Sequence, residues 1–292
     1  MTSSTYHLIT KCGRRESNED VERVKQNLTW DGYKLDNAYG PADIYIVCDG
    51  HGGKAVGRFA APLLEEHLLA RNLRYPLTKD YIVKTYNLIQ GMIINHPKQI
   101  GLECGCTALI VIIYFDADRR RSAQIINIGD SRCVFSKAGL AIPMTLDHKP
   151  SWPNEKKRID QVNAELGTNH RVKFRDGDFR IGDLSVSRAF GDINATPYVT
   201  HIPDIETVRI IKSVEFIILA CDGVWDVLRN EEVVNFVRDQ RDNNHTSFYN
   251  IPGFYPPVKS LISNESNIAE KLANYAIARG SGDNVSVIIV FF

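Results

Sequence analysis

Five apolar runs rich in β-branched residues recur along this chain, and they predict buried β-strands. Stretches with helical periodicity lie in pairs between groups of strands rather than after every strand. This order favours an α+β protein, with strands packed on strands and helices outside, over a doubly wound parallel sheet. The predicted strands cover 44–48, 107–115, 123–128, 216–221 and 285–292, and the predicted helices cover 54–72, 81–94, 154–166, 231–240 and 268–278.

Composition and charge exclude several classes of protein. The 292 residues include 35 Lys and Arg and 35 Asp and Glu, and this zero net charge argues against a dedicated nucleic-acid binder. With 43% apolar and 24% charged residues, the chain is not wholly disordered. Its longest apolar run, 108–115, is too short to span a membrane, and 1–10 lacks the pattern of a secretory signal. We therefore expect a cytoplasmic protein without a membrane partner, and nuclear entry stays open.

No internal repeat, low-complexity segment or linker divides the chain, which predicts a single domain over 1–292. Residues 242–264 contain several Asn and Pro residues and predict an irregular surface insertion. The six cysteines lie mostly inside or beside apolar runs, and the spacing of Cys104 and Cys106 is too short for a CxxC motif. We expect reduced, structural thiols and a monomeric protein.

Acidic residues stand at the ends of the predicted strands. Asp49 follows the first run directly, Asp222 follows 216–221, and Asp283 stands just before the last run. If the last strand runs antiparallel to the other two, these three acids meet at one edge of the sheet. A carboxylate at the end of a buried strand is costly unless a positive charge neutralises it. No Lys or Arg is adjacent to Asp49 or Asp222 in the sequence, so a hard divalent cation is the natural partner.

A simpler explanation exists for each acid, because Asp-Gly after a strand is a common turn. Asp130 also follows a predicted strand and, like the other three acids, has a glycine neighbour. The turn explanation weakens at 49–53, where three glycines surround His51 and would bring an acid, a carbonyl and an imidazole together. The charged segment 14–20 is a solvated loop on one interpretation. On the other, Arg15 binds a substrate phosphate and Glu19 binds a metal.

With these segments in view, the chain resembles the metal-dependent serine/threonine protein phosphatases of type 2C, the PPM family. Any one matching segment is weak evidence for the resemblance, whereas the occurrence of all of them in the family's order is specific evidence. The resemblance covers roughly residues 6 to 292. The matching segments are RESNED (15–20), VCDGHGG (47–53), GCTA (105–108), NIGDSR (127–132), LDHKP (146–150), LSVSRAFGD (184–192), CDGVWD (221–226) and GDNVS (282–286).

The resemblance implies a centre that binds two Mg²⁺ or Mn²⁺ ions. Carried over residue by residue, Asp49 would bridge both ions. Asp222 and Asp283 would complete one site, and Glu19 with the Gly50 carbonyl would complete the other. Such an oxygen-only ligand set suits hard ions rather than zinc or copper.

The resemblance also implies roles for the remaining candidates. Asp20 would accept a hydrogen bond from metal-bound water, and Asp130 with Asp226 would hold a weaker third ion. Arg15 would grip the phosphoryl oxygens, and His51 would protonate the leaving oxygen. The implied fold is a central antiparallel β-sandwich flanked by helix pairs on both outer faces, in αββα layers.

The implied activity is Mg- or Mn-dependent hydrolysis of phosphoserine and phosphothreonine in phosphoprotein substrates. A metal-activated water attacks phosphorus directly, without a covalent phosphoenzyme. Two other functions stay open: a scaffold of the same fold that has lost catalysis, and another two-metal phosphoesterase such as a nuclease. The presence of Asp49, Asp222 and Asp283 disfavours the scaffold, and the zero net charge disfavours the nuclease.

Two features depart from the family pattern. Cys48 and Cys221 each come directly before an acid that the resemblance assigns to the metals. Packing in the core is the simple explanation for a cysteine at these positions, and redox control of the enzyme is the alternative. The segment 169–183 carries Arg171, Lys173, Arg175 and Arg180, which form a solvated face or recruit an acidic partner.

Overall fold

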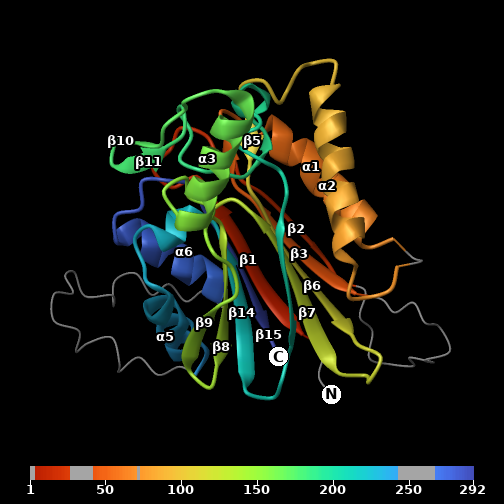
Figure 1. The fold of residues 1–292 in the computed structure, drawn as a ribbon. Helices are drawn as coiled ribbons and strands as arrows, with labels where there is room; N and C mark the ends of the chain where they lie inside the picture. The colour runs from red at the N-terminus through yellow and green to blue at the C-terminus, as the bar shows by residue number, and fades with distance from the viewer. Residues whose placement is uncertain (1–3, 27–41, 71–72, 243–266) are drawn as a thin grey trace.

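The computed structural model describes residues 4–26, 42–70, 73–242 and 267–292 (Figure 1). Within these ranges, two five-stranded sheets dominate, and every strand pair in them is antiparallel. The first sheet has the order β1 (Thr5–Lys11), β15 (Val285–Phe291), β14 (Val214–Ala220), β8 (Arg132–Lys137) and β9 (Leu140–Pro143). The second has the order β13 (Asp204–Arg209), β7 (Arg121–Ile128), β6 (Ala108–Phe115), β3 (Asp43–Cys48) and β2 (Val21–Lys25).

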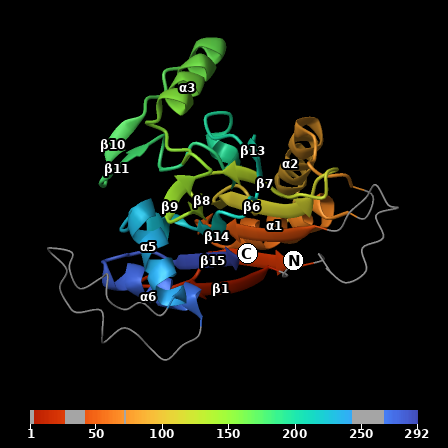
Figure 2. The ribbon, with the colours of Figure 1, turned by 90° about the horizontal axis from the view of Figure 1, so that it is seen from below.

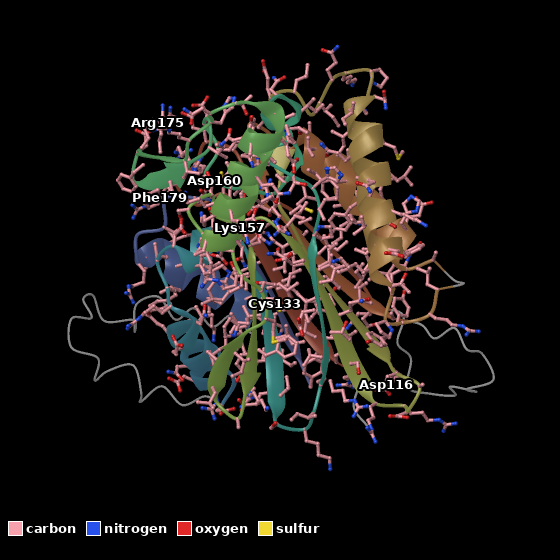
Figure 3. The ribbon with its side chains drawn as sticks, viewed as in Figure 1. Asp116, Cys133, Lys157, Asp160, Arg175 and Phe179 are labelled. Carbon is pink, nitrogen blue, oxygen red and sulfur yellow. The ribbon has the colours of Figure 1, made fainter. Side chains whose placement is uncertain are left out.

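The two sheets pack face to face, and helices cover both outer faces (Figures 1 and 2). Alternate residues of β3 show the arrangement: Tyr45 and Val47 pack between the sheets, whereas Ile44 and Ile46 pack under the helices. A strand that is buried on both faces needs apolar side chains at every position, which explains the unbroken apolar runs in the sequence. Cys133 on β8 belongs to the core between the sheets (Figure 3).

Two helix pairs form the outer layers. The pair α1 (Ala55–Leu68) and α2 (Lys79–Ile94) covers the sheet that contains β3. The pair α5 (Asn230–Arg241) and α6 (Ile268–Ala278) covers the sheet that contains β14. All five predicted strands and all five predicted helices are present, with ends shifted by a few residues. The expected αββα sandwich is confirmed.

Short elements gather at one end of the sandwich. A three-stranded sheet has the order β12 (Phe190–Gly191), β5 (Gly105–Cys106) and β4 (Gly50–His51). Nearby lie α3 (Pro153–Leu166), the hairpin of β10 (Lys173–Arg175) with β11 (Asp178–Arg180), the 3₁₀ turn Ile193–Ala195 and the short helix α4 (Asp222–Trp225) (Figure 1). Arg175 and Phe179 mark the hairpin in Figure 3.

One expectation about the acids was wrong. Asp49 follows β3 and Asp222 follows β14, and these strands belong to different sheets. The last strand, β15, is antiparallel to β14 but does not pair with β3. The three acids therefore meet across the end of the sandwich rather than at one edge of a sheet, because sheet packing and not strand pairing brings Asp49 to the others.

Among the described residues, no helix is both long enough and apolar enough to cross a membrane. Almost all of the insertion predicted at 242–264 lies outside the described residues, which stop at Asp242 before resuming at Asn267.

All six cysteines are free thiols, and four of them are fully buried. We therefore predict that a strong reductant leaves the melting temperature and the catalytic activity implied by the resemblance unchanged, because no disulfide constrains the chain. The measurement is a thermal melt with and without reductant, with a disulfide-stabilised protein as the positive control. A large drop in melting temperature on reduction would show that this prediction is wrong.

A buried charge anchors α3 to the segment that follows the hairpin. The Glu155 carboxylate accepts hydrogen bonds from Arg188 (2.5 and 3.0 Å), Arg158 (3.1 and 3.2 Å) and Ser187 (2.8 Å), and Glu155 is only 3% exposed. Burial alone would raise the pKa of Glu155. The hydrogen bonds and charges of the two arginines outweigh burial, so its pKa lies below the usual value.

A carboxyl group whose pKa is lowered by folding stabilises the fold above its unfolded pKa, and this stabilisation is lost as the pH falls through the folded pKa. We predict that Glu155→Gln costs roughly 3–5 kcal/mol of unfolding free energy at neutral pH, because it leaves Arg158 without a carboxylate partner and Arg188 with Asp204 alone. The difference from wild type should shrink under acid conditions. Urea unfolding at pH ~7 and pH ~3 measures this, with the exposed Glu165→Gln on the same helix as control. An equal difference at both pH values would contradict the assignment.

Candidate active site

A pocket of about 520 Å³ is lined by residues of the short elements β4, β11 and α4. It brings together eight of the candidate residues from five separate segments of the sequence, and it leaves out Asp20 and Asp226. The hairpin side of the pocket is contributed by Arg180 and 183–186. The candidate residues in its lining are Arg15, Glu19, Asp49, Gly50, His51, Asp130, Asp222 and Asp283.

Asp49 and Asp222 form the centre of the site. Ligand atoms of Asp49, Cys221 and Asp222 all lie within 4.8 Å of one another. The Cys221 sulfur already accepts a hydrogen bond from the Ser286 amide (3.1 Å), which leaves the two carboxylates to face a cation. The backbone of Asp49 is held by Thr107, whose amide donates to the Asp49 carbonyl (2.8 Å) and whose Oγ1 accepts from the Asp49 amide (3.1 Å).

The electrostatics of this pair fit a cation site. Burial, followed by the charge of Asp222, raises the pKa of Asp49 well above its usual value. The pKa of Asp222 is also raised well above its usual value, first by burial and then by the charges of Asp130 and Asp226. Carboxylates that repel one another in this way ionise readily once a divalent cation lies between them. The oxygen donors present therefore fit the hard ions that the sequence implies.

Glu19 and Gly50 lie against each other in the lining of the pocket. The Glu19 carboxylate accepts a hydrogen bond from the Gly53 amide (3.1 Å). A Cβ atom at Gly50 would overlap the Glu19 carbonyl oxygen, so only glycine lets these two backbones approach. The glycines of this turn serve different contacts: Gly50 allows the approach to Glu19, whereas Gly52, with a φ of 69°, allows the approach to the Glu103 carbonyl.

Asp283 and Arg15 are paired in this structure. Arg15 Nη2 donates to Asp283 Oδ2 (2.7 Å), and Arg15 Nε donates to the Gly282 carbonyl (3.3 Å). The Arg15 side chain is 58% exposed, so it can turn toward a ligand at little cost. The expected phosphate-binding cation therefore stands at the mouth of the pocket, beside an expected metal ligand.

The structure assigns a supporting role to Asn284, which sequence reasoning missed. Its side-chain amide donates to the carbonyls of Cys12 and Ser17 (both 2.9 Å), and its Oδ1 accepts from the Glu19 amide (2.8 Å). The segment that carries Arg15 and Glu19 is therefore tied to the strand that begins after Asp283. The signal in the sequence was the asparagine next to Asp283 in the GDNVS segment.

Lys149 was also missed, and it changes the expectation for a third ion. Its ammonium lies 2.5 Å from Asp130 Oδ2 and 3.6 Å from Asp178 Oδ2. Asp130 is thus already neutralised by a lysine that the sequence separates from it by 19 positions. Asp226 lies outside the pocket, in a neighbouring depression of about 350 Å³ with Arg132, and burial raises its pKa.

Asp20 lies behind the pocket rather than in its lining. It is 8% exposed, and its Oδ2 accepts a hydrogen bond from Ser286 Oγ (2.5 Å). Its Oδ1 is buried and has no hydrogen-bond partner among the described residues. Burial is the main cause that raises the pKa of Asp20 to about 7. An unpartnered buried oxygen next to Glu19 fits an acceptor for a water molecule in the site.

His51 reaches the pocket from β4 and is held from behind by Asp192, another residue that sequence reasoning missed. His51 Nε2 donates to Asp192 Oδ2 (2.7 Å). Burial alone would lower the pKa of His51, but this hydrogen bond and the Asp192 charge outweigh it and raise the pKa. The imidazole is therefore suited to carry a proton at the pocket wall.

Comparisons with known proteins agree with this geometry. The family model for protein phosphatase 2C matches residues 4–285. A PP2C-like domain-containing protein of Acanthamoeba polyphaga mimivirus is 61% identical over 174 residues, which cover 60% of this chain and 96% of that protein. The probable protein phosphatase 2C 7 of Oryza sativa subsp. japonica is 33% identical over 285 residues. That match covers 96% of this chain, which spans 63% of the length of the rice protein.

Solved structures share the fold. A C. elegans sex determining protein superposes with a TM-score of 0.77 and 25% identity, over 100% of this chain and 65% of that one. A serine-threonine phosphatase 2C from Toxoplasma gondii superposes with a TM-score of 0.68 and 19% identity, over 98% of this chain and 94% of that one. The chain belongs to the protein phosphatase 2C family, the metal-dependent serine/threonine protein phosphatases.

Proposed function

We propose that this pocket binds two Mg²⁺ or Mn²⁺ ions and hydrolyses phosphoserine and phosphothreonine in phosphoprotein substrates. The observation that carries the proposal is the convergence of Asp49 and Asp222 from opposite sheets, with the pKa of each raised by burial and by neighbouring acids. Such a cluster destabilises the fold unless a cation balances it. A catalytically inactive scaffold would have no need to keep it.

The ligands divide around Asp49. Asp49 would contact both ions, Asp222 and Asp283 would hold one of them, and Glu19 with the Gly50 carbonyl would hold the other. All five lie in the lining of one pocket, which supports this division. When bound, the ions lower the pKa of a coordinated water to generate the nucleophile and screen the charge of the phosphoryl group.

The protein side chains then handle substrate and protons. Arg15 offers two parallel N–H donors to phosphoryl oxygens, for which a planar guanidinium is well matched. His51 delivers a proton to the serine or threonine oxygen as the P–O bond breaks, so that a neutral alcohol departs. Asp20 orients the attacking water through its unpartnered oxygen. No covalent phosphoenzyme is needed.

A third, weaker ion at Asp130 and Asp226 competes with Lys149. Because the Lys149 ammonium already lies 2.5 Å from Asp130, an ion there must displace that charge or share the carboxylate with it. We infer that Asp130 and Asp226 bind a third ion with low affinity. The two ions at Asp49 would then suffice for the hydrolysis.

The described residues support one domain, because the core between the sheets is shared by strands from both. We infer a monomer in the cytoplasm that acts on proteins and binds neither nucleic acid nor membranes. The balanced charge of the chain and the free thiols support this inference.

We predict that exhaustive chelation abolishes turnover of a phosphothreonine peptide and that added Mg²⁺ or Mn²⁺ restores it. Loss of a residue that only supports a metal ligand typically lowers activity ~10–100-fold. Asp49→Asn should reduce turnover by more than this, because the charge of Asp49 serves both ions. Calorimetry of metal binding should show weaker affinity in the same variant. The exposed Asp118→Asn is the matched control. Full activity after chelation, or near-native turnover of Asp49→Asn, would contradict the two-ion assignment.

We further predict that His51→Gln slows phosphopeptide hydrolysis by ~10²–10⁴-fold, the usual contribution of a general acid. Nitrophenyl phosphate should be affected far less, because nitrophenolate leaves without a proton, whereas a serine or threonine alkoxide does not. Turnover of both substrates at saturating metal measures the difference. Equal losses on the two substrates would remove the general-acid role, and rescue by excess metal would make His51 a ligand instead.

A further inference from the structure

Asp192, the partner of His51, is held in an unusual backbone conformation. Its φ of 46° and ψ of 42° lie in the left-handed region, which residues other than glycine rarely adopt. The Asp192 amide donates to the Cys104 carbonyl (3.1 Å), and the Ile193 amide donates to the Gly101 carbonyl (2.9 Å). Asp192 is also only 6% exposed. Strain of this kind persists where surrounding contacts determine the conformation, and it concentrates at functional sites.

The space around the Asp192–His51 pair is shaped by a glycine. A Cβ atom at Gly105, on β5, would overlap both Asp192 Oδ2 and His51 Nε2. Glycine at this position therefore lets the carboxylate and the imidazole meet at 2.7 Å. Since an ionised carboxylate only accepts hydrogen bonds, Nε2 carries the hydrogen in this contact. Among the described residues, none hydrogen-bonds His51 Nδ1. In the protonated imidazolium both ring nitrogens carry a hydrogen, so Nε2–H stays on Asp192 and Nδ1–H is the proton delivered to the substrate.

A buried glutamine on α2 fixes the chain just before Asp192. Gln90 Nε2 donates to the Gly191 carbonyl, and the Gly191 amide donates to Gln90 Oε1, both at 2.9 Å. Gln90 is 4% exposed, so both of these hydrogen bonds are shielded from water. One turn earlier on the same helix, Tyr86 stacks on Phe190 with ring centroids 4.9 Å apart. The helix thus holds Phe190 by stacking and Gly191 by two hydrogen bonds.

We propose that Asp192 and Gln90 are positioning residues for His51. Gln90 clamps Gly191, the clamped backbone places the Asp192 carboxylate, and that carboxylate orients the imidazole so that Nδ1 faces the pocket. Neither Asp192 nor Gln90 lines the pocket, so both act through His51. The proposal rests on the general-acid role proposed for His51. It extends the active site from the pocket wall into the face of α2.

The chain contains a matched control for the clamp. Gln124 is buried to a similar degree and makes the same pair of 2.9 Å hydrogen bonds with the backbone of Leu77, which is outside the pocket lining. Gln90→Met and Gln124→Met each remove one such clamp at similar side-chain volume. Both should lower the melting temperature. Only Gln90→Met should change the ratio of phosphopeptide turnover to nitrophenyl phosphate turnover.

The main experiment compares kcat and KM on the two substrates at saturating Mn²⁺ for wild type, Asp192→Asn, Gln90→Met, Gln124→Met and His51→Gln. We expect Asp192→Asn to lower kcat on the phosphopeptide about tenfold or more beyond its effect on nitrophenyl phosphate, part of the ~10²–10⁴ that a general acid contributes. KM should change little, because substrate contacts are intact. In the His51→Gln background, Asp192→Asn should add no further loss, since the two residues act as a unit.

Nitrogen-15 NMR of labelled histidine supplies a readout that is independent of activity. In wild type, His51 should carry a hydrogen on Nε2 in both its neutral and its protonated form, and Asp192→Asn should lose that signature while the other histidines keep theirs. If Asp192→Asn does not fold, Gln90→Met carries the same test, with a shifted or broadened Nε2–H signal expected.

Two outcomes would overturn the inference and leave the proposed function intact. One is a selective phosphopeptide loss in His51→Gln that neither Asp192→Asn nor Gln90→Met reproduces. The other is a loss in Asp192→Asn that adds fully to that of His51→Gln. Equal losses on both substrates in His51→Gln itself would instead overturn the general-acid role on which the inference rests.

Discussion

Repulsion between half-buried carboxylates at the end of the sandwich is the constraint on which the site depends. Asp49 and Asp222 are brought together by the packing of two sheets whose shared core includes Tyr45, Ile217 and Ile288. Burial of apolar side chains in that core supplies the free energy that holds like charges close together. The pKa of each acid is raised as a result, and a divalent cation is the partner that relieves the repulsion. Metal dependence thus follows from the architecture of the sandwich.

Positive charges and hydrogen bonds from distant segments complete the site around this centre. Arg15 pairs with Asp283, and Lys149 pairs with Asp130, so two of the acids already have a partner of opposite charge. Asp49 and Asp222 form no such pair among the described residues. On the proposed assignment, an ion meets no competing side chain at Asp49 and Asp222, whereas at Asp283 and Asp130 it competes with Arg15 and Lys149. The pocket therefore combines a metal centre with a cation that can turn toward a phosphate.

Some parts of the fold could be predicted from the sequence better than others. Strands buried on both faces, such as β3 and β6, have continuous apolar runs, and these were predicted nearly to their ends. The outer strands β2 and β13 read VERVK and DIETVR and were missed. Both lie at edges of their sheet, where one partner strand is absent and polar side chains face water. Their alternation is short and is interrupted by charges, so periodicity alone does not identify them.

The sequence by itself determined the family, the layered fold and the set of acids, because motifs in order and apolar periodicity are local properties of the chain. Only the tertiary structure decided that Asp49 and Asp222 come from opposite sheets, since strand pairing cannot be read from strand order. It also decided which groups meet: Asp192 lies 141 positions from His51, and Gly191 lies 101 positions from Gln90. Side-chain partners at such separations are selected by the packing of the whole core, and no local pattern records them.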